Sequence, residues 1–255
     1  MILDRIIEAK RREVAERKEK TPLAVLEKRI AELPQARDFK AALSPGAIIA
    51  EVKRRSPSRG VLRADLDPAG IARTYEFQGA AAISVLTDAA FFGGSEADLA
   101  AVRDAVTLPV LRKEFIIDPW QIHETRAIGA DALLLIATIL SEKELSEYRK
   151  AAESLGIAVL VEAHDGTELD KALAAGAEIV GINSRDLRTF TTDIETARVL
   201  APRVPRDRIV VAESGIRTRR EIETLQEAGV QAFLIGETLV AAPDIAGKLA
   251  ELLGR

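Results

Sequence analysis

The chain contains no cysteine, and this absence sets the first limits on its chemistry. Without cysteine a protein forms no disulfide, has no thiolate nucleophile and binds no metal through sulfur. The two histidines, His123 and His164, lie far apart in the sequence and show no metal-ligand spacing. We therefore expect no metal site, and we expect both histidines to be structural or surface residues.

Long hydrophobic runs and a strong net charge are also absent. No stretch reaches the roughly 20 apolar residues that a helix needs to cross a bilayer. The start of the chain is charged from Asp4 onward and lacks the apolar run of a signal peptide. The net charge of −4 gives no reason to expect nucleic acid as a partner. We therefore expect a cytoplasmic monomer that binds neither nucleic acid nor membranes.

Short apolar runs recur along the chain and predict eight strands. They cover residues 47–52, 81–86, 109–112, 131–136, 157–161, 178–182, 208–212 and 231–235. Their spacing is that of a βα unit, and their near-continuous apolar character is typical of a parallel sheet covered on both faces. Between them, Ser141 with Glu144 predicts a helix start, and Gly156, Gly176 and Gly229 predict helix ends.

The number and spacing of these units favour a closed (β/α)8 barrel, a TIM barrel of the α/β class, over an open doubly wound sheet. No G-x-G-x-x-G sequence follows the first predicted strand, as a dinucleotide-binding fold would require. Helical patterns over 3–18 and 22–32 predict an N-terminal helical extension, residues 1–45, packed on the barrel over one mouth. No linker divides the chain, so we expect a single domain over 1–255.

Polar residues follow the predicted strands at their C-terminal ends, where such barrels carry their chemistry. The polar residues are Glu51, Lys53, Lys113, Glu162, Asn183, Arg185, Glu213, Ser214 and Glu237, and the glycines Gly215 and Gly236 lie among them. The fourth strand instead ends in the apolar Leu134, Leu135 and Ile136. One charge at a strand end is commonly just the first solvated residue of a loop. Several charges around one mouth are costly unless they pair or bind a ligand, so we predict a site suited to proton transfer.

Glycines after the last two strands predict a phosphate site. Gly215 in ESGI and Gly236 in LIGE allow backbone N–H groups to approach an anion, at the corner where barrels frequently bind phosphate. Closure of the barrel would bring Lys53 and Ser56 beside them. The alternative is that Gly215 and Gly236 are ordinary turn glycines that bind no phosphate. The FFGGS sequence at 91–95 is likewise either a plain turn or a mobile loop with an aromatic contact.

Eight segments in order along nearly the whole chain resemble the indole-3-glycerol phosphate synthase family. They are IIAEVKRRSPSRG, AISVLTDAAFFGGS, LPVLRKEFIIDPWQI, GADALLLI, LVEAH, GINSRDLRTF, VAESGI and FLIGETL. EVKRRSPSRG and LRKEFIID are highly specific to that family. LRKEF replaces the commoner LRKDF, and VEAH replaces VEVH, at positions not expected to be catalytic.

The resemblance implies a reaction of tryptophan biosynthesis without a cofactor or metal. A lyase of this family acts on 1-(o-carboxyphenylamino)-1-deoxyribulose 5-phosphate. It closes the pyrrole ring and then removes carbon dioxide and water, which gives indole-3-glycerol phosphate. The expected partner of the chain is therefore a small phosphorylated substrate.

The resemblance also implies a role for each matching residue. Lys113 is the general acid that protonates the carbonyl oxygen as the ring carbon attacks, and Glu162 is the base in the dehydration. Lys53 holds the carboxylate or phosphate side of the substrate and donates the proton that expels hydroxide. Glu51 and Glu213 orient the two lysines. The polar wall is completed by Asn183 and Arg185. The phosphate and substrate rim is lined by Ser56, Ser214, Gly215, Gly236 and Glu237. The aromatic ring of the substrate is contacted by Phe92, Phe115, Leu134 and Leu187.

Two alternative functions stay open at this point. Phosphoribosylanthranilate isomerase is another phosphate-binding barrel of amino-acid biosynthesis. Its family typically uses a Cys and Asp pair for catalysis, and this chain has no cysteine. A non-catalytic barrel, or an engineered scaffold that retains the pocket, is the alternative from another class, because a few substitutions change chemistry without changing the fold. The presence of all the expected charged residues argues against an inactive barrel.

Overall fold

Eight parallel strands close into a barrel in the computed structural model, which describes residues 2–57, 59–186 and 191–255. The barrel strands are β1 (Ala47–Val52), β4 (Ala82–Leu86), β5 (Val110–Lys113), β6 (Ala132–Ile136), β7 (Ala158–Ala163), β8 (Ile179–Asn183), β9 (Ile209–Glu213) and β10 (Ala232–Ile235). Ala47 pairs with Ala232, which joins β1 to β10 and closes the ring. Each strand lies within two residues of its predicted bounds, and the predicted (β/α)8 barrel is confirmed.

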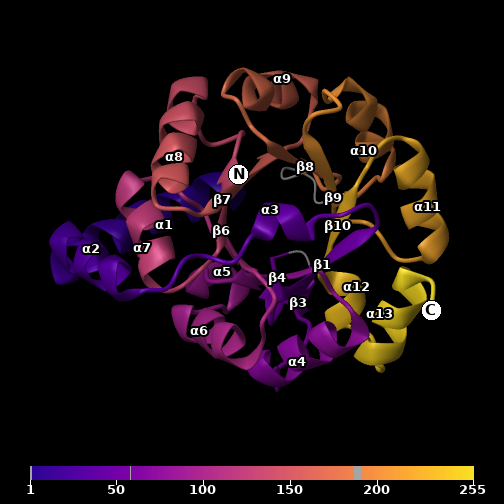
Figure 1. Cartoon of the computed structure of the whole chain (residues 1–255), viewed down its shortest axis with the longest axis horizontal. Helices are drawn as coiled ribbons and strands as arrows, with labels where there is room; N and C mark the ends of the chain where they lie inside the picture. Colours follow the sequence, from indigo (N-terminus) through magenta and orange to yellow (C-terminus); the bar gives the residue numbers. More distant parts are fainter. Residues whose placement is uncertain (1, 58, 187–190) are drawn as a thin grey trace.

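Helices form a ring outside the barrel (Figure 1). In chain order they are α4 (Pro68–Gln78), α6 (Glu96–Ala105), α7 (Pro119–Ala127), α8 (Glu142–Ser154), α9 (Gly166–Ala174), α10 (Glu195–Leu200), α11 (Arg219–Glu227) and α13 (Ile245–Leu253). As predicted, Ser141 caps α8, and the Glu144 carboxylate accepts the Ser141 N–H at 2.8 Å. Within the described residues, no helix combines the length and the apolar character needed to cross a membrane.

Short elements occupy the loops beyond the C-terminal ends of the strands. They are the hairpin β2 (Arg55–Ser56) and β3 (Gly60–Val61), α5 (Ala89–Phe92) and α12 (Glu237–Val240), and the 3-10 helix η1 (Ala201–Arg203) follows α10. Asp88 caps α5 by accepting the Phe91 N–H at 2.7 Å. The two phenylalanines of the FFGGS sequence are therefore the last residues of this short helix, and Gly93 ends it. Arg54 bonds to Asp98 at 2.8 Å, which ties the loop after β1 to α6.

The N-terminal extension contains α1 (Ile2–Lys20), α2 (Leu23–Glu32) and α3 (Phe39–Ala42). The first of these helices, α1, lies at the C-terminal rim of the barrel, because Lys10 pairs with Asp88 beyond β4 and with Glu114 beyond β5, both at 3.0 Å. The second, α2, packs on α7, where Leu26 and Trp120 share a small apolar cluster with α1.

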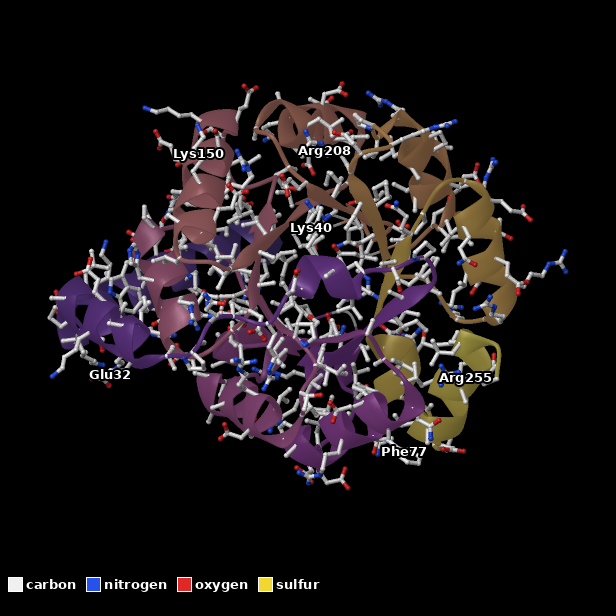
Figure 2. The ribbon with its side chains drawn as sticks, viewed as in Figure 1. Glu32, Lys40, Phe77, Lys150, Arg208 and Arg255 are labelled. Carbon is white, nitrogen blue, oxygen red and sulfur yellow. The ribbon has the colours of Figure 1, made fainter. Side chains whose placement is uncertain are left out.

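The short helix α3 covers the opposite end of the barrel and lies across its middle in Figure 1. Phe39 is fully buried against the apolar side chains of the barrel interior. Lys40, labelled near the centre of Figure 2, pairs with Glu178 at 2.7 Å. The extension therefore reaches both ends of the barrel, whereas the sequence predicted a position over one mouth.

Alternation along the strands divides the core into two layers. Side chains such as Ile49, Leu111 and Leu160 fill the barrel interior, and the residues between them pack outward against the helices. Each fully buried aliphatic side chain contributes roughly 1.5–3 kcal/mol. Two residues further along the same strands, the inward face carries Glu51, Lys113 and Glu162. The interior is thus an apolar base that supports a polar mouth.

Candidate active site

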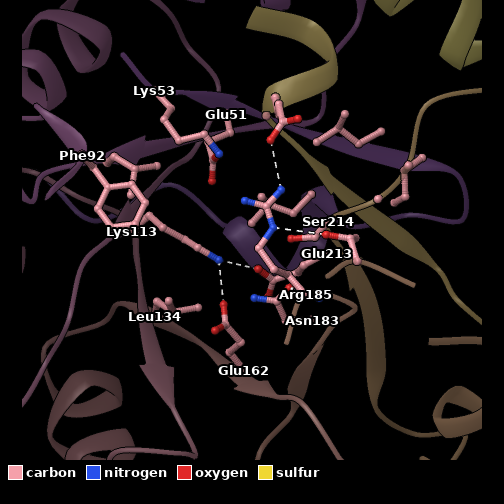
Figure 3. Close-up of a pocket in the computed structure, with 18 of the residues that line it drawn as sticks. Glu51, Lys53, Phe92, Lys113, Leu134, Glu162, Asn183, Arg185, Glu213 and Ser214 are labelled. Carbon is pink, nitrogen blue, oxygen red and sulfur yellow. Dashed lines mark hydrogen bonds and ion pairs between the residues drawn. The ribbon is translucent and has the colours of Figure 1, made fainter. Parts of the chain in front are cut away.

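A cavity of about 420 Å³ opens at the C-terminal ends of the strands (Figure 3). The predicted site residues that line it are Glu51, Lys53, Phe92, Lys113, Phe115, Leu134, Glu162, Asn183, Arg185, Glu213, Ser214, Gly215, Gly236 and Glu237. They come from all eight barrel strands or from the loops directly after them. Closure of the barrel therefore gathers residues that are far apart in the sequence into one site.

Two predicted site residues stand apart from this set. Ser56 is buried in the β2–β3 hairpin and does not line the cavity, because its hydroxyl turns back to accept the Arg59 N–H at 3.2 Å. Pro57 and Arg59, from the same loop, line the cavity instead. Leu187 lies outside the described residues. Contacts of Ser56 and Leu187 with a substrate therefore stay predictions.

Lys113 lies between two carboxylates at the centre of the cavity. Its Nζ is 2.8 Å from Glu162 Oε2 and also bonds to Glu213 Oε2, as Figure 3 shows. These side chains come from β5, β7 and β9 and are almost completely buried. Each lies two residues beyond an inward-facing apolar residue, so strand alternation aims all three at the axis. A proton donor and two possible acceptors meet at this point.

Burial and charge shift the pKa values of these groups in different directions. Burial alone would lower the pKa of Lys113, but Glu162, Glu213 and Glu51 outweigh it and raise that pKa. Burial alone would raise the pKa of Glu162, but Lys113 and His164 hold it well below its usual range. In Glu213 burial prevails over the opposing effect of Lys113 and raises the pKa to about 7. At neutral pH Glu162 is ionised, whereas Glu213 titrates.

A second pair of opposite charges lies on β1. Lys53 Nζ is 2.5 Å from Glu51 Oε1, and both side chains line the cavity. A Cβ atom on Gly236 would come within 2.1 Å of that same carboxylate oxygen. Glycine at the exit of β10 therefore leaves the space in which Glu51 lies.

Two arginines and a left-handed turn mark another edge of the cavity. The Glu237 carboxylate accepts from Arg185 Nη2 at 3.0 Å and pairs with Arg59 Nε at 3.0 Å. Ser214 and Gly215 have φ angles of +65° and +83°. Left-handed turns of this kind orient backbone N–H groups into anion-binding concavities. Guanidinium and backbone donors at one edge are suited to a phosphate group.

Apolar side chains form the remaining wall. The rings of Phe92 and Phe115 lie 6.1 Å apart between centroids, and Leu134 and Ile136 extend this surface. Leu135, which the sequence placed in the same wall, faces outward into the layer under the helices because of strand alternation. The cavity therefore offers an apolar surface for a flat ring, with the two lysines and the anion-binding edge around it.

His164 contacts the site residue Glu162 from outside the cavity lining, whereas the sequence predicted only a structural or surface residue. Its Nε2 is 3.3 Å from Glu162 Oε1, and its Nδ1 is 2.9 Å from Glu168 Oε2. Its position two residues after Glu162 continues the alternation of β7, and this spacing was the signal in the sequence. His123, on α7, instead has its Nδ1 3.3 Å from the Pro119 carbonyl. The two histidines therefore differ in their surroundings: His164 contacts two carboxylates, one of which lines the cavity, whereas His123 contacts a backbone carbonyl of its own helix.

Residues 2–57, 59–186 and 191–255 contain no metal site of the kind that His, Asp and Glu form. No group of three or more His, Asp or Glu side chains arranged to hold a metal ion is found there. Ion pairs within the cavity join Glu51 to Lys53, Glu162 to Lys113 and Glu237 to Arg185. The arrangement is one of acid, base and anion-binding groups.

Comparisons with known proteins point to one family. The family model described as indole-3-glycerol phosphate synthase matches residues 3–252. The indole-3-glycerol phosphate synthase of Acidithiobacillus ferrooxidans is 51% identical over 245 residues, which cover 94% of this chain and 93% of that protein. The protein of the same name from Alkaliphilus metalliredigens is 46% identical over 255 residues, with 99% and 98% covered.

Solved structures of more distant proteins share the architecture. A crystal structure of 3-hexulose-6-phosphate synthase matches with a TM-score of 0.64 at 16% identity, over 82% of this chain and 98% of that one. Thiamine phosphate pyrophosphorylase from Pyrococcus furiosus matches with a TM-score of 0.62 at 15% identity, over 82% and 95%. At these identities the likeness shows the barrel fold alone.

Proposed function

Because the chain belongs to the indole-3-glycerol phosphate synthase family, we propose that it catalyses the reaction of that family. It converts 1-(o-carboxyphenylamino)-1-deoxyribulose 5-phosphate to indole-3-glycerol phosphate, carbon dioxide and water, as a carboxy-lyase of tryptophan biosynthesis. The observation that carries the proposal is the position of Lys113 between Glu162 and Glu213, inside the cavity that the family's segments line.

The shape and charge of the cavity support one orientation of this substrate. Its phosphate lies at the edge formed by Gly215, Gly236 and Arg185, where backbone and guanidinium donors are available. Its aromatic ring lies against Phe92 and Phe115. The carbonyl carbon of the ribulose chain then falls between these two groups, within reach of the lysines.

Ring closure needs an acid beside the carbonyl oxygen. The ring carbon that bears the carboxylate attacks the carbonyl carbon, and Lys113 gives its proton to the oxygen, so that no alkoxide forms in a site of low dielectric. Loss of carbon dioxide then returns the electron pair of the broken bond to the ring. The ion pairs of Lys113 with Glu162 and Glu213 support this role, because they hold the ammonium group in place.

Dehydration needs a base and an acid on different sides of the new ring. Glu162 removes a proton as the base, and Lys53 protonates the leaving hydroxyl group. Glu51 positions Lys53 through the contact of 2.5 Å. The low pKa of Glu162, which Lys113 and His164 maintain against burial, keeps this carboxylate ready to accept a proton.

We also propose that residues 1–255 act as one domain and as a monomer. The ion pairs of Lys10 across to Asp88 and Glu114 support a single folded unit, with residues 1–45 as its extension. The exposed large apolar side chains of the described residues are dispersed over several elements, as in Phe77, Val61 and Val199, which supports a monomer. Light scattering of the purified protein measures its mass in solution, and the cytoplasmic location stays a prediction.

A fluorescence assay tests the proposed function. The purified protein mixed with the carboxyphenylamino-deoxyribulose phosphate should generate the fluorescence of an indole product. Glu162→Gln should lower kcat on the order of 10²- to 10⁴-fold, the usual contribution of a general base, with an unchanged circular dichroism spectrum. A folded wild-type protein that produces no indole would exclude this function and leave the non-catalytic barrel.

A further inference from the structure

His164 lies just beyond β7 with its ring between two carboxylates. Its Nε2 faces Glu162 Oε1 at 3.3 Å, and its Nδ1 faces Glu168 Oε2 at 2.9 Å and Thr138 Oγ1 at 3.1 Å. The His164 backbone N–H also donates to Glu168 Oε2, at 2.9 Å. The ring is therefore fixed by β7, by α9 and by the loop after β6.

Glu168 is itself held rigidly in the first turn of α9. Its backbone N–H donates to the N-cap residue Asp165 at 2.9 Å. Burial alone would raise the pKa of Glu168, but the contacts with His164 and Thr138 lower it, so the carboxylate is ionised. The side of His164 that faces away from the cavity thus meets a fixed negative charge.

The two carboxylates beside Lys113 need more than one cation. A single ammonium group does not balance two carboxylates that are almost completely buried, and such a pair shares a proton. Glu162 and Glu213 are alike in their contact with Lys113. They differ in that the second oxygen of Glu162 has the His164 ring 3.3 Å away, an ion-pair contact without the geometry of a hydrogen bond, whereas Oε1 of Glu213 has no hydrogen-bond partner among the described residues.

We propose that His164 is a positioning residue that decides which of these carboxylates is the base. As an imidazolium held by Glu168, it places a positive charge 3.3 Å from Glu162 and keeps that carboxylate ionised, so that Glu213 takes the proton. This inference rests on the proposed function for the role of Glu162. It adds His164 and Glu168 to the residues on which the reaction depends, although neither touches the substrate.

The charge on the ring follows from its neighbours. Burial would lower the pKa of His164, but the carboxylates of Glu162 and Glu168 on its two sides raise it to about 10. Thr138 is neutral, and Lys113 lies beyond Glu162. The ring is therefore an imidazolium at neutral pH.

Nitrogen NMR of the histidine rings tests this arrangement without any assay of activity. The chain has only two histidines, so a protein labelled with ¹⁵N-histidine gives two sets of ring signals, and His123→Gln assigns them. At neutral pH the wild-type His164 ring should show the shifts of an imidazolium, and Glu162→Gln combined with Glu168→Gln should convert it to the neutral form. A neutral His164 ring in the wild-type protein overturns the proposal.

The pH profile of kcat tests the effect on the base. His164→Gln removes the charge and keeps a side-chain N–H, so Glu162 competes with Glu213 for the proton. We expect kcat to fall by about tenfold or more near pH 6 and to recover to within about threefold near pH 9, with KM little changed. His123→Gln is the matched control and should follow the wild-type profile.

The outcomes separate the possible roles of His164. A fall in kcat that is the same at every pH would show a purely structural role, and an unchanged profile would show no role; either result overturns the proposal. Glu168→Gln should move the acid limb of the profile in the same direction as His164→Gln, by a smaller amount. If wild-type protein makes no indole at all, the proposed function fails, whereas the NMR result still decides the charge of His164.

Discussion

Glu162 and Glu213 have the same side chain and the same lysine partner, yet the barrel gives them different properties. Lys113 and His164 lower the pKa of Glu162 against the effect of burial. Burial raises the pKa of Glu213 to about 7, because Lys113 offsets only part of that effect. The negative charge of Glu162 adds to this rise, so the two carboxyl groups, which share Lys113, ionise at different pH values.

The raised pKa of Glu213 predicts a particular dependence of stability on pH. Its favourable contribution is complete below the unfolded pKa, 4.5, and is lost as the pH rises to about 7. Glu213→Gln removes this dependence. The free energy of unfolding of the variant, relative to wild type, should therefore increase by about 3 kcal/mol between about pH 4.5 and pH 8, at roughly 1.4 kcal/mol for each unit of the pKa difference.

Urea unfolding at the two pH values measures this difference. Glu223→Gln is a suitable control, because Glu223 forms an exposed i,i+4 pair with Arg219. The control should show no comparable change between the two pH values. An equal difference from wild type at both pH values for Glu213→Gln would contradict the assignment.

Strand alternation made most of the site predictable at the level of residues. Once a strand is located, its inward positions follow, and Lys113 and Glu213 lie at the mouth as expected. Ser56 does not line the cavity, because it lies in a two-residue hairpin strand where its hydroxyl accepts the Arg59 N–H, and its role as a substrate ligand stays a prediction. The spacing from Glu162 places His164 on the inward face of its strand, but it does not show that Glu168, on the next helix, lies beside the ring, so the sequence alone did not assign it a role.

At the scale of elements, α1 is joined to the two loops that carry the aromatic wall. Lys10 is 1% exposed and pairs with Asp88 and Glu114, each at 3.0 Å. Asp88 caps the helix that ends in Phe92, and Glu114 accepts the Phe115 N–H at 2.8 Å. The N-terminal helix thus fixes the base of both rings that we assign to the substrate.

Loss of the Lys10 charge should destabilise the protein strongly. Lys10→Met removes the buried cation that pairs with Asp88 and leaves Glu114 with the more distant Arg112, at 4.0 Å. Breaking a buried pair in this way costs about 3–5 kcal/mol. Lys18→Met, from the same helix, removes a partly exposed pair with Asp118 and should cost about 0–1 kcal/mol. Chemical unfolding of both variants measures the difference, and equal costs would contradict the role of Lys10.

Long elements were predictable from the sequence, and short ones were not. The apolar runs located the barrel strands, and the pattern over 22–32 located α2. The hairpin β2–β3 and α5 have two to four residues per element, and contacts such as Arg54 with Asp98 hold them in place. Two to four residues are too few to show a periodic pattern, so the sequence does not predict these elements and only their contacts in the folded barrel define them.

At the scale of the whole molecule, closure of the barrel creates the active site. Ala47 beside Ala232 joins the first strand to the last, and this contact brings Gly236 over Glu51. The apolar base of the barrel and α3 below it hold the charged residues of the mouth at fixed positions. The order of the reaction then depends on two lysines that reach the cavity from different strands.

A single-turnover experiment that follows carbon dioxide and indole separately tests this account most directly. Wild-type protein should release one carbon dioxide for each indole formed. Lys113→Ala should release neither, because ring closure precedes decarboxylation, whereas Lys53→Ala should release carbon dioxide and delay the appearance of indole. Carbon dioxide from Lys113→Ala at the wild-type rate, or no indole from folded wild-type protein, would contradict it.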